Sequence, residues 1–186
     1  MATITFNGQD LQIADQDRLN VIQAAKIAEC AKIIAVDKHK KPLDLAREFG
    51  ATDVLESSAD NAGQVRELTK ERGSDYVFDT VGAHETISEA LKFARKGGTV
   101  VVSGLFRTDA QATISTFPFV MHEKRLIGSL YGSGQPLQDI PKLAALYGEG
   151  KLKLDELVTR TYRLDQVNEA LAALAGGEGA RGVIQW

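Results

Sequence analysis

Two kinds of segment alternate along most of the chain. Short runs rich in β-branched residues, such as 32–36 and 99–103, are separated by longer stretches whose apolar residues recur at helical spacing. Runs of the first kind predict buried strands, and the 3.6-residue spacing predicts helices. Their alternation is typical of βαβ units. The pattern therefore predicts an α/β fold with a doubly wound, mainly parallel sheet.

Apolar spacing and turn residues set the expected boundaries. Glycine tolerates the left-handed backbone that ends many helices, so Gly50, Gly73 and Gly97 are expected just past three of them. The predicted helices are 17–29, 42–49, 60–72, 83–95, 117–122, 136–149 and 164–175, and the predicted strands are 32–37, 52–55, 76–80, 99–103, 125–130, 157–162 and 182–186.

The amino-terminal segment has a different pattern. Residues 3–6 and 10–13 alternate polar with apolar positions around Asn7-Gly8, which predicts a β-hairpin over 3–13. Asp15 or Asp17 is expected to cap the first helix. The length suits one domain over 1–186. Its expected parts are the hairpin leading into the first helix (1–16), a core (17–150) and a strand–helix–strand return segment (151–186).

Composition narrows the classes of partner. The net charge of −3 gives no general attraction to nucleic acid or to an anionic membrane, and no apolar run is long enough to span a bilayer. We therefore expect neither as a partner. Cys30 is the single cysteine, which excludes a disulfide within the chain and favours a cytoplasmic protein. Its neighbours favour a buried thiol over a reactive one.

Five segments together carry a resemblance that none of them carries alone. In their order and spacing, residues 19–186 resemble the Rossmann-like coenzyme-binding domain of zinc-type medium-chain alcohol dehydrogenases. The segments are 33–37 (IIAVD), 46–53 (AREFGATD), 75–82 (DYVFDTVG), 97–104 (GGTVVVSG) and 123–132 (EKRLIGSLYG). The resemblance also implies a homodimer that pairs through the strand from Arg125 to Leu130.

The resemblance implies positions for a nicotinamide coenzyme. Asp37 ends the second Rossmann-type strand, where a carboxylate binds the adenosine ribose and favours NAD over NADP. Arg181 matches an arginine that reaches the pyrophosphate, although a solvated loop arginine is an equal alternative. Further candidates follow two other strands, where ligands bind in open α/β sheets: Thr80, Val81, Gly82, Ser103, Gly104 and Leu105.

Two departures from the family pattern bear on chemistry. His39, His84, His122 and Cys30 are scattered, so no zinc and no catalytic residue are expected. In place of the glycine-rich phosphate turn, residues 13–18 read IADQDR. Carboxylates at that helix end would repel a diphosphate, which predicts weak or no NAD binding.

The opening of the chain has a second resemblance. Residues 1–29 are similar to the first strands and helix of a β-grasp [2Fe-2S] ferredoxin. The cluster-binding cysteines are absent, so no iron–sulfur cluster is expected. These observations favour a chimera, natural or engineered, joined within the first helix.

Three functions remain open from the sequence. The favoured one is a non-catalytic, non-enzyme domain with a disrupted dinucleotide site. The alternatives are a weak NAD-binding module and a fragment of an NAD-dependent alcohol dehydrogenase, an oxidoreductase acting with a partner that supplies the missing domain. Asp75 and Asp79, together with the histidines, also suggest acid–base chemistry, but the absence of a pocket wall from a second domain disfavours that interpretation.

Overall fold

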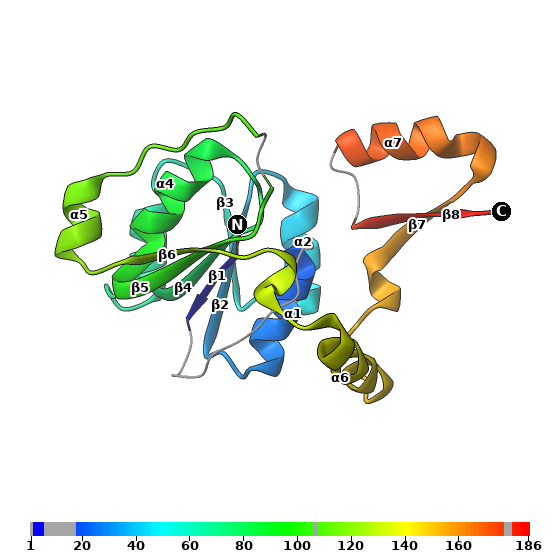
Figure 1. Ribbon diagram of the computed structural model, residues 1–186, viewed down its shortest axis with the longest axis horizontal. Helices are drawn as coiled ribbons and strands as arrows, with labels where there is room; N and C mark the ends of the chain where they lie inside the picture. Colours follow the sequence, from blue (N-terminus) through cyan, green and yellow to red (C-terminus); the bar gives the residue numbers. More distant parts are fainter. Residues whose placement is uncertain (1, 6–17, 106–107, 177–179) are drawn as a thin grey trace.

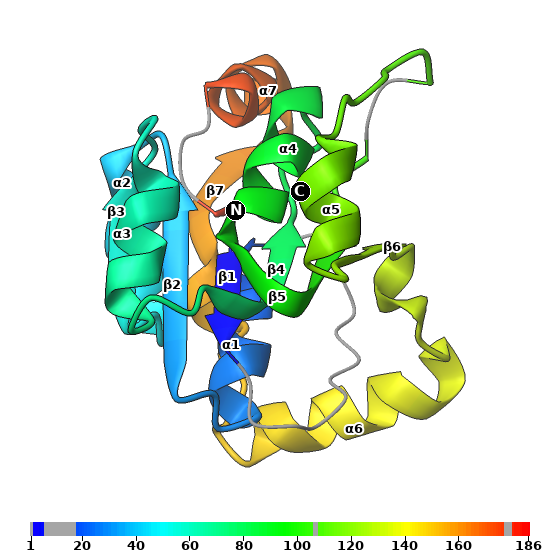
Figure 2. The same cartoon turned by 90° about the vertical axis from the view of Figure 1, so that its left-hand side faces the viewer.

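A six-stranded sheet forms the body of the protein, with helices on both of its faces (Figures 1 and 2). The computed structural model describes residues 2–5, 18–105, 108–176 and 180–186. In spatial order the strands are β3 (Asp53–Glu56), β2 (Lys32–Asp37), β1 (Ala2–Thr5), β4 (Ser74–Asp79), β5 (Ala94–Val102) and β6 (Arg125–Gly128). The helices are α1 (Arg18–Ile27), α2 (Lys40–Phe49), α3 (Asn61–Leu68), α4 (His84–Phe93), α5 (Thr116–Met121), α6 (Pro136–Gly148) and α7 (Val167–Ala175). The Rossmann-like α/β fold is confirmed.

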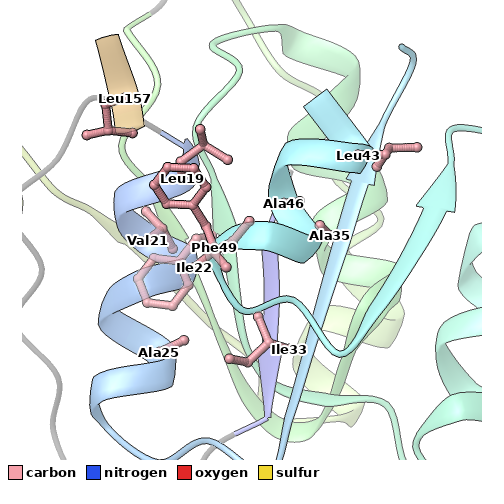
Figure 3. Packing of buried hydrophobic residues seen from close by; sticks show 11 residues of the cluster. Leu19, Val21, Ile22, Ala25, Ile33, Ala35, Leu43, Ala46, Phe49 and Leu157 are labelled. Atoms are coloured by element: carbon pink, nitrogen blue, oxygen red, sulfur yellow. The ribbon is translucent and has the colours of Figure 1, made fainter. Parts of the chain in front are cut away.

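Strand alternation divides the core into two layers. On β2, Ile33 and Ala35 face the cluster formed with α1 and α2, whereas Ile34 and Val36 face the cluster formed with α3 and α4. Figure 3 shows the first cluster, where Phe49 of α2 packs between side chains of α1 and β2. Because successive strand residues point to opposite faces, one continuous apolar run serves both layers.

Strand β1 runs against both of its neighbours. It pairs antiparallel with β2 and with β4, while the pairs β2–β3, β4–β5 and β5–β6 are parallel. The strand order is that of a Rossmann fold, but the strand in the first position is reversed. The first strand of the predicted hairpin thus lies inside the main sheet. The predicted turn at Asn7-Gly8 and the second strand at 10–13 lie outside the described residues.

Two helix ends differ from the predicted ones. Gly50 ends α2 as expected, with a left-handed φ of 118°. Helix α3 ends at Leu68 rather than near residue 72, because Lys70 and Glu71 take left-handed φ values of 55° and 63°. Gly97 caps no helix: β5 already begins at Ala94, and this glycine lies in the register shift between Ala94 and Thr99.

The last part of the chain forms a separate parallel pair, β7 (Val158–Arg163) with β8 (Arg181–Gln185), connected through α7 (Figure 1). Leu157, at its start, is only 1% exposed and belongs to the α1–α2 cluster. Gln23 of α1 reinforces this junction, since its side chain donates to the Lys153 carbonyl at 3.0 Å and accepts from the Lys153 N–H at 2.7 Å. Among the described residues, no helix is long and apolar enough to cross a membrane.

Candidate functional site

The candidate residues from three strands meet at one edge of the sheet. Asp37 is the last residue of β2, residues 80–82 follow β4, and residues 103–105 follow β5. These strands are parallel to one another in direction, so their carboxyl ends share the edge where open α/β sheets bind ligands. Between β2 and β4, the reversed strand β1 presents its amino end, since Ala2 pairs with both Ala35 and Phe78.

Asp37 is a buried carboxylate at this edge. Its Oδ1 accepts a hydrogen bond of 3.0 Å from the backbone N–H of His39, the residue that precedes α2. Its backbone carbonyl accepts another, of 2.9 Å, from Ser57. The side chain is therefore oriented by the loop that leads from β2 into α2. A carboxylate in this place can accept hydrogen bonds from vicinal hydroxyl groups of a ribose.

The loops after β4 and β5 pack backbone against backbone. Gly82 has a φ of +74°, and a Cβ added there would lie 2.5 Å from the carbonyl oxygen of Leu105. A Cβ added to Gly104 would lie 2.2 Å from the Gly82 nitrogen. Real Cβ atoms do not approach so closely, so both positions exclude any other residue unless the backbone moves.

This pair of loops offers a ligand both apolar and polar groups. Val81 is 43% exposed and Leu105 is 70% exposed, so both present apolar surface at the edge. The Thr80 hydroxyl oxygen is buried and has no hydrogen-bond partner within the described part of the chain. The Ser74 hydroxyl, at the amino end of β4, is buried and unpaired in the same way among the described residues, and buried hydroxyl groups are commonly paired with ordered water.

Arg181 lies elsewhere in the fold. It begins β8 in the two-stranded sheet, its side chain is exposed, and its carbonyl oxygen lies 3.3 Å from the Thr159 hydroxyl that donates to it. The structure thus brings Asp37 and the two loops to one edge and places Arg181 on a different sheet (Figure 1). Asp15 and Asp17, which were predicted to cap the first helix, lie outside the described residues.

The described residues do not fit a zinc site. They contain no group of three or more histidine, cysteine, aspartate or glutamate side chains able to hold a metal ion. His84 pairs with the neighbouring Glu85 at 3.0 Å. Cys30 packs against the α1–α2 cluster, and burial raises the pKa of its thiol to about 11. This keeps the thiol protonated at neutral pH, although Cys30 is only partly buried where the sequence predicted a buried thiol.

Asp75 and Asp79 do not form an acid–base pair. They lie at opposite ends of β4, four residues apart, which is about 13 Å along an extended strand. Asp75 binds Arg95 and Arg72 at the amino end. Asp79 is fully buried at the carboxyl end and bonds to the loop that follows it. The sequence analysis did not predict that Asp79 binds this loop. A charged residue at the end of an apolar strand (YVFD) was the signal that could have indicated it.

Comparison with known proteins decides the family. The family profile described as zinc-binding dehydrogenase matches residues 19–149. This chain belongs to the zinc-binding dehydrogenase family. It is 38% identical over 169 residues to the NDMA-dependent alcohol dehydrogenase of Amycolatopsis methanolica, a match that covers 89% of this chain and 46% of that protein. It is 32% identical to alcohol dehydrogenase B of Mycobacterium tuberculosis, with 89% and 45% covered.

Solved structures of zinc-binding dehydrogenases share the fold. Benzyl alcohol dehydrogenase of Acinetobacter calcoaceticus superposes with a TM-score of 0.86 at 27% identity, covering 94% of this chain and 51% of that one. An alcohol dehydrogenase zinc-binding domain protein of Burkholderia ambifaria gives the same score and identity over 97% of this chain and 49% of its own. The chain therefore spans about half the length of the relatives it matches.

These relatives correct two sequence-based interpretations. The non-enzyme interpretation is wrong, because relatives at 32% and 38% identity are alcohol dehydrogenases and point to an oxidoreductase. That interpretation relied on the absence of zinc ligands. In a segment about half as long as its relatives, such an absence gives no information on whether the whole protein is an enzyme. The chimera and the ferredoxin-like segment over 1–29 are not supported either. Much of that segment lies outside the described residues, and β1 belongs to the main sheet.

Proposed function

We propose that this chain is the coenzyme-binding portion of an NAD-dependent alcohol dehydrogenase. In such an enzyme NAD supplies the hydride acceptor for oxidation of an alcohol. The observation that carries the proposal is Asp37, a buried carboxylate at the carboxyl end of β2 in a chain whose relatives are alcohol dehydrogenases.

Each half of the sheet is expected to bind a different half of the coenzyme. A Rossmann-type sheet holds one nucleotide on each side of its centre. Strand β2 ends at Asp37, which would accept hydrogen bonds from the adenosine ribose. Residues 80–82 and 103–105, which follow β4 and β5, would contact the nicotinamide half. The exposed apolar side chains of Val81 and Leu105 support a ligand at this second position.

The affinity of the chain alone is expected to be weak. The segment 13–18 carries carboxylates where related folds have glycines that approach the coenzyme phosphates. The weak NAD binding that this segment implies stays a prediction. We place the dissociation constant for NADH at or above roughly 100 μM, equivalent to about 5.5 kcal/mol of binding free energy. Arg181 stays a candidate pyrophosphate contact.

Exposed apolar surface supports the view that more protein packs around this chain. In α7, Leu171 is 57% exposed and Leu174 is 72% exposed. Strand β6 forms one edge of the sheet, with Ile127 49% exposed and Leu130 just beyond it 62% exposed. An apolar edge strand is normally paired or covered. Pairing of two copies through residues 125–130 would cover it, and this homodimer stays a prediction.

The test is a fluorescence titration of the chain with NADH and with NADPH. The unmodified chain is expected to bind NADH more tightly than NADPH. Asp37→Asn keeps an acceptor for the His39 N–H but loses the charge that favours ribose hydroxyls. We expect it to weaken NADH binding roughly tenfold, as for the loss of one charge-assisted hydrogen bond, and to reduce the preference over NADPH.

Asp44→Asn is the matched control, since it makes the same change on an exposed face of α2. It should leave both titrations unchanged. The proposal fails if millimolar NADH produces no saturable signal, or if Asp37→Asn and Asp44→Asn behave alike.

A further inference from the structure

Asp79 connects the two loops of the candidate site. It is the last residue of β4, and it is 0% exposed. Its carboxylate accepts hydrogen bonds from the Val81 N–H, at 3.0 Å, and from the Thr86 hydroxyl, at 2.6 Å. Its backbone carbonyl accepts from the N–H groups of Ser103, at 2.9 Å, and Gly104, at 3.0 Å. The carboxylate thus fixes the start of the β4 loop, and the backbone carbonyl of the same residue anchors the start of the β5 loop.

The carboxylate determines the path of the β4 loop. By binding the Val81 N–H and the first turn of α4 through Thr86, it closes residues 79–86 into one turn. This hydrogen bond is charge-assisted and partly buried, so the turn would open or rearrange without its acceptor. The path matters because Gly82 must pass within contact of Gly104 and Leu105, where no room is left for a Cβ.

We propose that Asp79 is a positioning residue for the coenzyme: it holds residues 80–82 and 103–105 in a preformed arrangement that receives the nicotinamide half. This inference rests on the proposed function. Asp79 itself is fully buried, so it would act on the coenzyme only through these loops. Preorganised contacts spare a binding site the entropy of ordering its loops, so loosening them lowers affinity without removing a single contact atom.

The alternative is that Asp79 serves folding alone, and the other end of the same strand supplies the comparison. Asp75 is 7% exposed and binds Arg95 and Arg72, far from both loops. Loss of either aspartate should destabilise the protein. Only loss of Asp79 should change coenzyme binding.

The experiment compares NADH with AMP as ligands of Asp79→Ala, Asp79→Asn, Thr86→Val and Asp75→Ala. AMP reports on the Asp37 half of the site and NADH on both halves. We expect Asp79→Ala to weaken NADH binding roughly tenfold, the size expected when a charge-assisted hydrogen bond is lost, and to leave AMP binding unchanged. Asp75→Ala should leave both ligands unchanged.

Two gentler variants keep the test valid if Asp79→Ala does not fold. In Asp79→Asn the amide oxygen can accept from Val81, and its NH₂ can donate to the Thr86 oxygen, whose own hydrogen can turn to the Ala83 carbonyl at 2.7 Å. This variant should therefore retain most NADH affinity. Thr86→Val keeps the shape of the side chain but removes the hydroxyl. Its NADH affinity should lie between those of Asp79→Asn and Asp79→Ala.

Amide hydrogen exchange of residues 80–86 provides a readout that needs no ligand, because the carboxylate binds this segment directly. Exchange there should be faster in Asp79→Ala than in Asp75→Ala. Equal exchange in these two variants, or equal weakening of AMP and NADH by Asp79→Ala, would overturn the positioning role. If the unmodified chain binds neither NADH nor AMP, the proposed function fails, and faster exchange would still support Asp79 as the residue that fixes the loops.

Discussion

Strand β4 carries a buried aspartate near its amino end and another at its carboxyl end, and the two are partnered in different ways. Asp75 binds the side chains of Arg95 and Arg72, which are 34% and 67% exposed. Asp79 binds a backbone N–H and a hydroxyl group of the loop that follows it. The amino end is thus held by flexible charged side chains, and the carboxyl end by a fixed backbone path.

We infer from this difference that Asp75 contributes to stability alone, whereas Asp79 contributes to stability and to ligand binding. Arginine side chains can return to water when their partner is lost, so the amino edge of the sheet tolerates change. The loops at the carboxyl edge have no such freedom, because their backbones touch at Gly82 and Gly104. A ligand site needs that fixed geometry. The following changes test the contrast, in order of decreasing effect.

The largest effect is expected at the carboxyl edge from Gly104→Ala. The new Cβ would meet the Gly82 nitrogen at 2.2 Å and its Cα at 2.8 Å, so the two loops must separate. We expect a loss of about 3 kcal/mol in the free energy of unfolding, measured with urea, together with weaker NADH binding. Gly148→Ala is the control, since a Cβ there meets nothing within 4 Å. Equal behaviour of the two variants would contradict the tight fit.

A smaller effect is expected at the amino edge from Asp75→Ala. The change removes the acceptor of Arg95 and Arg72, but both arginines are exposed enough to be hydrated again. We expect the free energy of unfolding to fall by about 2 kcal/mol, the range of one charged hydrogen bond. Urea unfolding measures the loss, and an NADH titration of the same variant should match that of the unmodified chain. A change in NADH affinity would erase the distinction between the two edges.

The smallest effect concerns pH and the pair between Lys32 of β2 and Asp53 of β3, also at the amino edge, with a nitrogen–oxygen distance of 3.1 Å. Burial alone raises the pKa of Asp53, but hydrogen bonds from Thr52 and Lys32, with the charges of Lys32 and Arg47, outweigh it and lower the pKa below its ordinary value of 3.8. A lowered folded-state pKa contributes stability that is present above the unfolded-state value and is lost as the pH falls through the folded-state value.

Unfolding free energies measured across the acid range should therefore decline below about pH 4, and slightly less steeply in Asp53→Asn than in the unmodified chain. NADH affinity at neutral pH should be the same in both. An identical acid decline would show that this surface pair contributes nothing, as many exposed pairs do.

Much of the fold was predictable because local signals agreed with the tertiary structure. The strands β2 to β6 and the glycine end of α2 follow from apolar runs and a left-handed cap. The errors lie where the backbone departs from a regular pattern. Lys70 and Glu71 adopt positive φ values, which lysine and glutamate rarely take and which the sequence therefore does not predict. Gly97 lies inside a bulged strand instead of ending a helix. The direction of β1 was equally hidden, since alternation predicts a strand and not its orientation.

The candidate site was predictable in part. The positions of Asp37 and of the two loops follow from one rule, that parallel strands end at the same edge. The role of Asp79 does not, because a sequence shows that an aspartate ends a strand and not which N–H groups it meets.

By itself, then, the sequence determined which segments are strands and helices and which family their order matches, because burial and backbone propensity act over a few neighbouring residues. Only the tertiary structure decided that β1 lies reversed between β2 and β4, that β7 pairs with β8, and that Gly82 touches Gly104. These are contacts between residues far apart along the chain, and which residues meet is set by how the elements pack, even where, as at Gly82 and Gly104, only one residue type fits the contact.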